Sequence, residues 1–411
     1  MTIYFVAGEV SADNHGAALM RSLRELNCEL KFMGRGGPQM QEVAGEQFKN
    51  WISEAAVLGL WEVLRKYGYF REQFRQTLHE IRQSKPDAVV LIDYPGFNLR
   101  LARALRRQAP RQKIIYYISP QVWAWNRGRI KRMAHFIDLV LCIFPFEVDL
   151  YNQAGLRAVF VGHPMIERLK ARKIDAERDP NLIGLFPGSR LREVRKIFPV
   201  MLETARQLRK RKRNLRFEVA AASEHLAHEI SKLLATGSPL LSWRGEGRAR
   251  GATQEDPQVI RITVGQAAEI MQRAWVGIVA SGSATLEAAY FRLPFVLIYK
   301  VAWPTYLAAR LVVNVKYLGM PNLLAGKEVL PEFIQHRADP GAIGKAVQPL
   351  IENANARDRI ISEFDAIVGK LQGAAVSGPP WRSEDSPSLM RGSGASQRAA
   401  RAIIEEIRSV N

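Results

Sequence analysis

Two short loops rich in glycine and serine have the residue types of phosphate-binding turns. Each loop follows an apolar run and precedes a segment of good helix formers, so each is expected to join a strand to a helix. Backbone N–H groups at a helix start are unpaired and carry a partial positive charge, which favours a phosphate there. An ordinary strand-to-helix turn is the alternative. The loop residues are Gly188, Ser189 and Arg190, and then Ser281, Gly282, Ser283 and Ala284.

Charged side chains beside both loops extend this interpretation to a nucleotide. Arg190 offers a planar fork for phosphate oxygens, with Glu193 close behind it. Glu287 is expected one helical turn beyond the second loop, where its carboxylate could accept hydrogen bonds from a ribose diol. The glycines at 34–38 do not have the spacing of a dinucleotide fingerprint, so NAD is not expected.

Two carboxylates at predicted strand ends have the chemistry of a general base. Asp93 ends an apolar run and precedes a Pro-Gly turn, where it could take a proton from an acceptor hydroxyl. An aspartate that only caps the turn is an equal alternative. Glu9 could be a second carboxylate of the same site, and His163 is expected to be structural. Because no Asp/His cluster has ligand spacing, we expect no metal, and no cofactor is expected either.

The elements that must position these residues alternate between strands and helices. Short apolar runs are typical of buried parallel strands, and ligands of open α/β sheets bind where such strands end. The expected strands are 2–7, 30–33, 88–93, 114–118, 139–143, 158–161, 182–186, 217–222, 259–263, 276–280 and 295–299. Helices are expected, among other places, at 14–26, 266–273, 284–291 and 395–410.

This alternation predicts an α/β protein with two Rossmann-like domains that face each other across a cleft. A polar, basic stretch at 168–180 is the expected linker. The predicted domains are 1–172 on the acceptor side and 173–365 on the donor side. A low-complexity loop at 366–394 and a closing helix at 395–411 follow.

The net charge of +19 predicts a polyanionic partner. Nucleic acid is not expected, since no nucleic-acid-binding motif accompanies the basic residues. A membrane surface fits better, because the segment at 55–70 is amphipathic and rich in aromatic side chains, although a helix that faces the core is the alternative. No apolar run approaches twenty residues, so no bilayer span is expected. We expect Cys28 and Cys142 to be reduced core residues of a cytoplasmic protein without a secretory signal.

Ten motifs occur in the order found in lipid-A-disaccharide synthases, which the sequence resembles over nearly its whole length. The most distinctive are Ser-Pro-Gln-Val-Trp-Ala-Trp at 119–125 and Pro-Asn-Leu-Leu-Ala-Gly at 321–326. The others stand at 7–13, 34–38, 92–98, 145–147, 162–164, 186–190, 280–287 and 394–396. One departure is Ser-Ala-Asp-Asn-His at 11–15, where the family usually shows Ser-Gly-Asp.

The resemblance implies an inverting glycosyltransferase of the GT-B type. It implies transfer of 2,3-diacylglucosamine from UDP onto 2,3-diacylglucosamine 1-phosphate, with a β-1,6 linkage and release of UDP. Asp93 falls on the family's proposed general base. Residues 188–190, 193, 281–284 and 287 would hold the UDP donor, together with Asn322 and Glu328. The acceptor or its acyl chains would meet Ser11, Asp13, Trp61, Phe97, Asn98, Trp123 and Trp125.

The same resemblance implies peripheral attachment to the anionic cytoplasmic face of the inner membrane, and a homodimer with exchanged C-terminal segments. Two other functions stay open. One is another UDP-sugar enzyme on this scaffold, such as a UDP-GlcNAc 2-epimerase or a related transferase. The other is a non-catalytic basic module that binds anionic lipid or RNA. The tryptophans at 123 and 125 argue against the epimerase, whose substrate is soluble.

Overall fold

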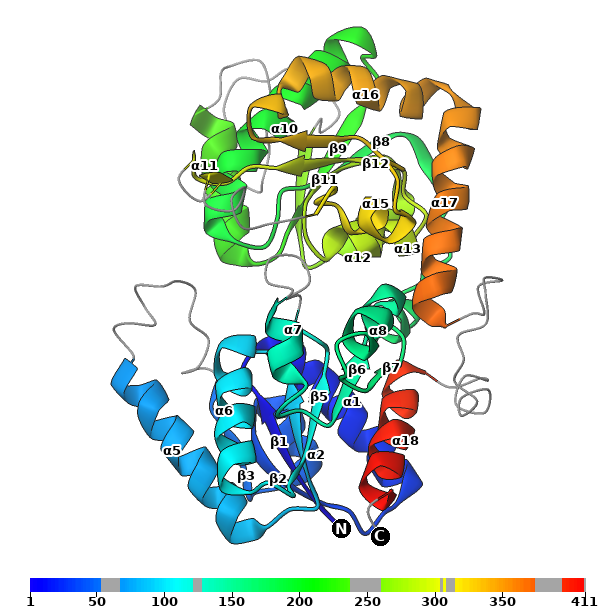
Figure 1. Cartoon of the computed structure of the whole chain (residues 1–411). Helices are drawn as coiled ribbons and strands as arrows, with labels where there is room; N and C mark the ends of the chain where they lie inside the picture. The colour runs from blue at the N-terminus through cyan, green and yellow to red at the C-terminus, as the bar shows by residue number, and fades with distance from the viewer. Residues whose placement is uncertain are drawn as a thin grey trace. The chain divides into compact units, whose positions relative to one another are not determined.

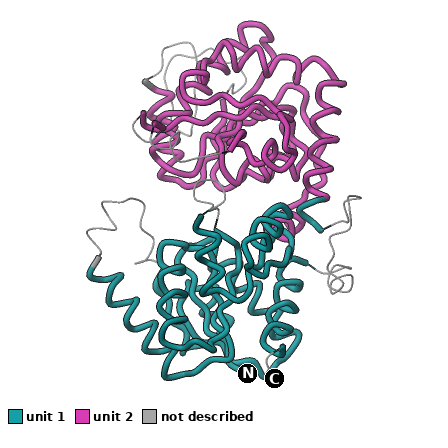
Figure 2. The backbone as a smooth tube through the Cα atoms, viewed as in Figure 1, with its two compact units in different colours: residues 1–164, 370–411 teal, residues 165–369 magenta. Residues whose placement is uncertain are grey.

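Apolar runs form two parallel sheets in the computed structural model (Figure 1). The structure describes residues 1–52, 67–120, 128–236, 260–303, 306–307, 315–373 and 394–409. It divides the chain into unit 1, Met1–Pro164 with Lys370–Asn411, and unit 2, Met165–Gly369 (Figure 2). The first division falls before the one predicted at 172/173, because α9 (Met165–Lys170) belongs to unit 2.

Unit 1 contains a seven-stranded parallel sheet in the order β3-β2-β1-β4-β5-β6-β7. Its strands are β1 (Thr2–Ala7), β2 (Lys31–Gly36), β3 (Phe48–Asn50), β4 (Ala88–Ile92), β5 (Lys113–Tyr117), β6 (Leu139–Cys142) and β7 (Ala158–Phe160). Its helices are α1 (Val10–Leu26), α2 (Pro38–Ala44), α5 (Tyr67–Ser84), α6 (Pro95–Gln108), α7 (Gly128–Met133), α8 (Pro145–Asn152) and α18 (Ala395–Arg408). The continuous burial of β1 and β4 follows from helices on both faces.

Unit 2 contains a six-stranded parallel sheet in the order β10-β9-β8-β11-β12-β13. Its strands are β8 (Asp179–Phe186), β9 (Arg216–Ala221), β10 (Ile260–Val264), β11 (Ala274–Ala280), β12 (Phe295–Tyr299) and β13 (Glu332–Ile334). After α9 its helices are α10 (Leu191–Arg211), α11 (Glu224–Thr236), α12 (Ala267–Arg273), α13 (Ala284–Tyr290), α15 (Met320–Ala325), the 3₁₀ turn η2 (Gln335–Arg337), α16 (Pro340–Glu352) and α17 (Ala354–Gln372). Both sheets therefore have the strand order of a Rossmann fold.

The closing helix α18 completes the core of unit 1, although most of that unit precedes it by more than two hundred residues. Ala399 and Ile403 are buried with the side chains of α1 and the sheet, and Figure 1 shows α18 in red beside α1. Buried Glu406 pairs with Lys113 at 2.6 Å and with Arg157. The last helix thus buries an apolar face and anchors it with one shared carboxylate.

The sequence predicts eleven of these strands closely and misses two, β3 and β13, each of three residues. Strand β2 continues through Gly34, where a side chain would lie 2.0 Å from the Phe5 carbonyl oxygen, so its glycines are strand rather than loop residues. Helix α1 begins at Val10, four residues before its predicted start. Cys142 is buried as expected, whereas Cys28 is exposed, which corrects that prediction.

Several predicted features lie outside the described residues. They are most of the amphipathic segment at 55–70, the tryptophan loop at 121–127, the charged loop at 245–257 and most of the low-complexity loop at 366–394. Within the ranges that the structure does describe, no helix combines the length and apolar character needed to cross a membrane.

The anchoring carboxylate of α18 generates a stability prediction. Glu406→Gln removes the charge that Lys113 and Arg157 share, so we expect it to lower the free energy of unfolding of unit 1 by about 1–2 kcal/mol. The matched control is Glu405→Gln on the exposed side of the same helix. Urea unfolding followed by circular dichroism gives the comparison, and equal midpoints for the two variants would contradict the assigned role.

Candidate functional site

The two predicted carboxylates of unit 1 leave from neighbouring strand ends. Strands β1 and β4 pair in parallel, with Ala7 opposite Ile92, so Glu9 and Asp93 follow the two strands at the same edge of the sheet. The chain order of the sheet reverses between these strands, which makes this edge a topological switch point. Ligands of open α/β sheets bind at such points. The fold therefore brings together the two residues that the sequence assigns to acid–base chemistry.

The carboxyl group of Asp93 is poised to exchange a proton near neutral pH. Burial raises its pKa to about 6, and the negative charge of Glu9 adds to the rise, whereas a hydrogen bond from the Tyr94 backbone N–H opposes it. Burial and Glu9 also raise the pKa of the Tyr94 hydroxyl to about 12. A carboxylate with a pKa of about 6 holds a proton more strongly than an exposed aspartate does, which suits a general base.

Aromatic rings pack beside Asp93. The Tyr94 ring lies over Gly8, where a Cβ atom would be 2.4 Å from it. Trp51 donates from Nε1 to the Ala7 carbonyl at 2.6 Å, and its ring centroid lies 5.1 Å from that of Phe97. Phe97 is buried in this cluster, so the structure uses most of its surface for packing rather than for a ligand. Ser11, at the start of α1, is exposed.

Asp13, predicted near the acceptor, is a buried structural residue. Its carboxylate accepts hydrogen bonds from the backbone N–H groups of Gly37, Gln39 and Met40 at 2.9–3.0 Å. These are N–H groups at the start of α2, which have no partners within their helix. The Asp13 carboxylate therefore links α1 to the start of α2, and its role near the acceptor stays a prediction.

Asn98 is likewise fully buried, and its role near the acceptor stays a prediction. Its side-chain Nδ2 donates to the Asp93 carbonyl at 2.8 Å. It therefore contacts the backbone of the predicted base rather than open space. Trp61, Trp123 and Trp125, the remaining predicted acceptor residues, lie outside the described residues.

The two small-residue loops of unit 2 also meet at a switch point. Strands β8 and β11 pair in parallel, with Phe186 opposite Val279, and the order of the sheet reverses between them. The loop at 188–190 follows β8, and the loop at 281–284 follows β11. Gly188 and Gly282 have φ angles of 108° and 147°, a region that favours glycine. The chain thus places both predicted phosphate loops side by side.

Arg190 extends from the first of these loops with most of its side chain exposed. It forms an ion pair of 3.2 Å with Glu193, one turn along α10. A Cβ atom at Gly188 would lie 2.6 Å from the Glu193 carboxylate, so the glycine makes room for this pair. Burial raises the pKa of Tyr299 at the end of β12, with Glu193 raising it further and Arg190 opposing. The exposed guanidinium is accessible to an anion.

Glu287 has a partner that the sequence did not suggest. Its carboxylate is 15% exposed and accepts from Arg168 of α9 at 2.7 Å. Burial raises the pKa of Glu287, while the positive charges of Arg168 and Arg172 oppose the rise. Both arginines belong to the basic stretch that was predicted to be only a linker. Its concentration of positive charge was the available signal for a functional role.

The other two predicted donor residues are Asn322, in α15, and Glu328, in the connection that follows it, and α15 contacts α13, the helix that begins at the second loop. Asn322 is fully buried, and its amide bonds to the backbone of Val329 and Leu330 and to the Glu332 carboxylate. Its side chain thus joins α15 to the next strand, and its contact with the nucleotide stays a prediction. Glu328 is exposed.

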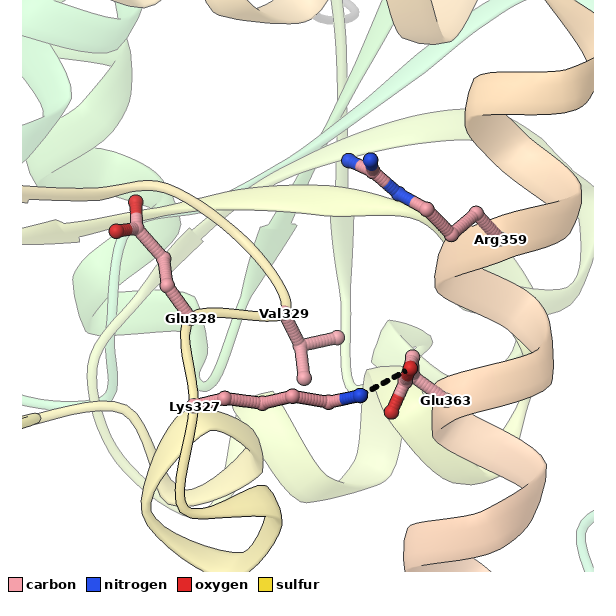
Figure 3. A pocket seen from close by; sticks show the side chains of 5 residues that line it. All are labelled: Lys327, Glu328, Val329, Arg359 and Glu363. Atoms are coloured by element: carbon pink, nitrogen blue, oxygen red, sulfur yellow. Dashed lines mark hydrogen bonds and ion pairs between the residues drawn. The ribbon is translucent and has the colours of Figure 1, made fainter.

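Glu328 lines a separate small pocket of about 220 Å³ (Figure 3). The pocket wall comes from the connection between α15 and β13 and from α17, without the loops at 188–190 and 281–284. Lys327 reaches across it to Glu363 at 2.6 Å, while Glu328 points to the other side. Across the described part of the chain, no group of three His, Cys, Asp or Glu side chains could hold a metal ion.

Two Rossmann-like units, each with loops that leave its switch point, define a GT-B-like fold. The structure is similar to that of UDP-GlcNAc 2-epimerase from Neisseria meningitidis bound to UDP-GlcNAc, with a TM-score of 0.58 and 11% identity over 90% of this chain and 98% of that one. The structure of the calicheamicin glycosyltransferase CalG4 is similar too, with a TM-score of 0.56 and 11% identity over 100% of this chain and 98% of that one. At this identity the likeness shows the fold alone.

The sequence comparisons show the family. The model of lipid-A-disaccharide synthetase matches residues 3–370. The lipid-A-disaccharide synthase of Geobacter sulfurreducens is 39% identical over 353 residues, which are 84% of this chain and 86% of that protein. The chain belongs to the lipid-A-disaccharide synthase family and is a glycosyltransferase, as the sequence motifs indicate.

The raised pKa of Asp93 predicts a pH-dependent stability. The folded protein holds the proton more tightly than the unfolded chain, so stability is lost as pH rises from about 4 through about 6. Asp93→Asn removes that loss. Relative to the wild type, we expect this variant to gain on the order of 1–2 kcal/mol between pH 4.5 and pH 7.5.

Urea unfolding at the two pH values measures this gain. The control is Glu46→Gln, which changes an exposed carboxylate of unit 1. A difference between Asp93→Asn and the wild type that stays constant across this range would show that the carboxyl group titrates normally.

Proposed function

We propose that the enzyme joins two acylated glucosamines, with UDP-2,3-diacylglucosamine as donor and 2,3-diacylglucosamine 1-phosphate as acceptor. Membership of the family supports lipid A precursors as substrates. The single observation that carries the mechanism is Asp93, a carboxylate with a raised pKa beside a second carboxylate at the switch point of unit 1.

In the proposed reaction, Asp93 takes the proton of the acceptor's 6-hydroxyl. The hydroxyl oxygen then attacks the anomeric carbon of the donor from the side opposite UDP, and the bond from that carbon to the diphosphate oxygen breaks. The new β-1,6 bond has inverted configuration, and UDP leaves with the bonding electron pair. Glu9 would keep the pKa of Asp93 raised, so the proton is held firmly once it is taken.

Unit 2 would hold the leaving group. The backbone N–H groups of 188–190 and 281–284 and the exposed guanidinium of Arg190 would offset the charge that develops on the diphosphate. Glu287 would accept hydrogen bonds from the ribose, and its ion pair with Arg168 would orient the carboxylate for this contact.

The direct test is turnover of Asp93→Asn with the two acylated substrates. Loss of a general base costs typically 10²–10⁴-fold, so we expect kcat to fall by about that factor. UDP affinity, measured by calorimetry, should stay within about twofold of the wild type because the proposed UDP residues are untouched. Glu46→Gln should keep wild-type turnover. Full activity of Asp93→Asn, or UDP release that does not require the acceptor, would contradict the proposal.

Peripheral binding to the anionic cytoplasmic face of the inner membrane is part of this proposal. It is supported by the net charge of +19 and by exposed apolar side chains such as Val10 beside Glu9 and Trp303 and Leu307 of unit 2. The homodimer stays a proposal too. In this structure α18 packs within its own chain.

Vesicle sedimentation tests the membrane proposal. We expect the protein to sediment with vesicles that contain about a quarter anionic lipid, and to be released from them at about 0.5 M salt, since screening weakens the attraction. Purely zwitterionic vesicles are the control. Equal binding to both kinds of vesicle would show that charge does not recruit the protein.

A further inference from the structure

Two consecutive residues at the proposed base have a strained backbone. Asp93 has a φ angle of 47° and Tyr94 one of 50°, although neither is glycine. A residue other than glycine in this left-handed region is destabilising, and it persists only where the surroundings impose it. The backbone around Asp93 must therefore be held by specific contacts.

The contacts that hold it converge on one carbonyl group. Nδ2 of Asn98 donates to the Asp93 carbonyl oxygen at 2.8 Å, and the hydroxyl of Tyr116 donates to the same oxygen. The Asp93 N–H donates to the Tyr117 carbonyl at 3.0 Å. The amide of Asn98 also lies 3.2 Å from the Ile92 carbonyl oxygen. Both ends of the Asp93 backbone are thus fixed by buried groups.

The peptide unit between Asp93 and Tyr94 also contacts the Asp93 carboxylate, through its N–H group. The N–H of Tyr94, which shares a rigid plane with the Asp93 carbonyl, hydrogen-bonds to the Asp93 carboxylate. A side chain that donates to the Asp93 carbonyl therefore also fixes the Tyr94 N–H, which donates to the Asp93 carboxylate. Rotation of this peptide plane would withdraw that N–H from the carboxylate.

We infer that Asn98 is a positioning residue for the proposed general base, because it holds the peptide plane that orients the Asp93 carboxylate. The inference rests on the proposed function of Asp93. Capping of α6 does not account for the Asn98 side chain, since its backbone N–H already closes the first turn by donating to the Tyr94 carbonyl at 3.0 Å. The side-chain amide of Asn98 instead bonds to backbone carbonyls at the end of β4.

The groups around Asp93 determine whether its pKa rises or falls when Asn98 is replaced. Glu9, after β1, raises the pKa of the Asp93 carboxyl, and burial raises it more. Tyr94 lowers it through its backbone N–H, and the Tyr116 hydroxyl, whose own pKa burial raises, bonds to the backbone carbonyl. Without Asn98 the opposing N–H bond weakens while burial and Glu9 remain. The pKa of Asp93 should then rise.

The experiment is the pH profile of kcat/KM for Asn98→Ala with the acylated donor and acceptor. We expect kcat to fall by about tenfold or more with both KM values changed less than about threefold. The acid limb of the profile should move up by about half to one pH unit. Tyr116→Phe, which removes one hydroxyl and little volume, should shift the limb in the same direction by less.

The matched control is Gln272→Ala in unit 2. Gln272 is also a buried amide that donates to two backbone carbonyls, so its loss should lower stability without moving the acid limb. A crystal structure of Asn98→Ala should show Asp93 outside the left-handed region. If Asn98→Ala fails to fold, Tyr116→Phe carries the test alone.

The outcomes separate this inference from the proposed function. An inactive Asp93→Asn together with unshifted profiles for Asn98→Ala and Tyr116→Phe would overturn the positioning role and leave the base in place. An active Asp93→Asn would overturn the base itself. If the acid limb of the pH profile shifts no further in Asn98→Ala than in Gln272→Ala, the Asn98 side chain has only a structural role.

Discussion

Parallel pairing between the first and fourth strand of each unit determines where the candidate site residues lie. In unit 1 it places the ends of β1 and β4 side by side, and in unit 2 it does the same for β8 and β11. The sheets reverse their chain order at these two places and nowhere else along their strand orders. The loops that leave there cannot be covered by a crossover helix, so their backbone groups and side chains stay accessible to ligands.

The residues at the two switch points differ in charge. Such a difference suits a transfer reaction, which needs a base for the acceptor and positive charge for the leaving group. Unit 1 presents two carboxylates, one of them mostly buried, and holds the strained backbone of Asp93 with a fully buried amide and a tyrosine hydroxyl. Unit 2 presents glycine loops and exposed Arg190. Ionising Asp93 is unfavourable for the fold, and a rigid scaffold tolerates that cost.

The strands could be predicted from sequence because continuous apolar runs identify buried parallel strands without reference to their neighbours. Strands β3 and β13 could not, since Lys49 and Asn50 in β3 and Glu332 in β13 leave no continuous apolar run, whereas the equally short edge strand β7 is wholly apolar. Asp93, Glu9 and the two glycine loops were predicted at strand ends, and the parallel order brings each pair together. The helix α18 was predicted, but its place in unit 1 depends on contacts that no local pattern records.

Asp13, Asn98 and Asn322 show why site residues are harder to predict. Each is a short polar residue within a family motif, and each was expected to face a ligand. In the structure each is buried and bonds to backbone groups of another segment. A motif records that a polar group is needed there, but only the three-dimensional arrangement shows whether it faces outward or inward. Arg168 is the opposite case, a residue assigned to a linker that pairs with Glu287.

A crystal structure of the enzyme with UDP would show whether the diphosphate binds between the two neighbouring loops of unit 2. We expect its oxygens within hydrogen-bonding distance of the backbone N–H groups at 188–190 and 281–284, with Arg190 turned from Glu193 towards a phosphate and the ribose hydroxyls on Glu287. Nucleotide density against the ends of β1 and β4 instead, or in the pocket beside Glu328, would show that these loops do not form the UDP site.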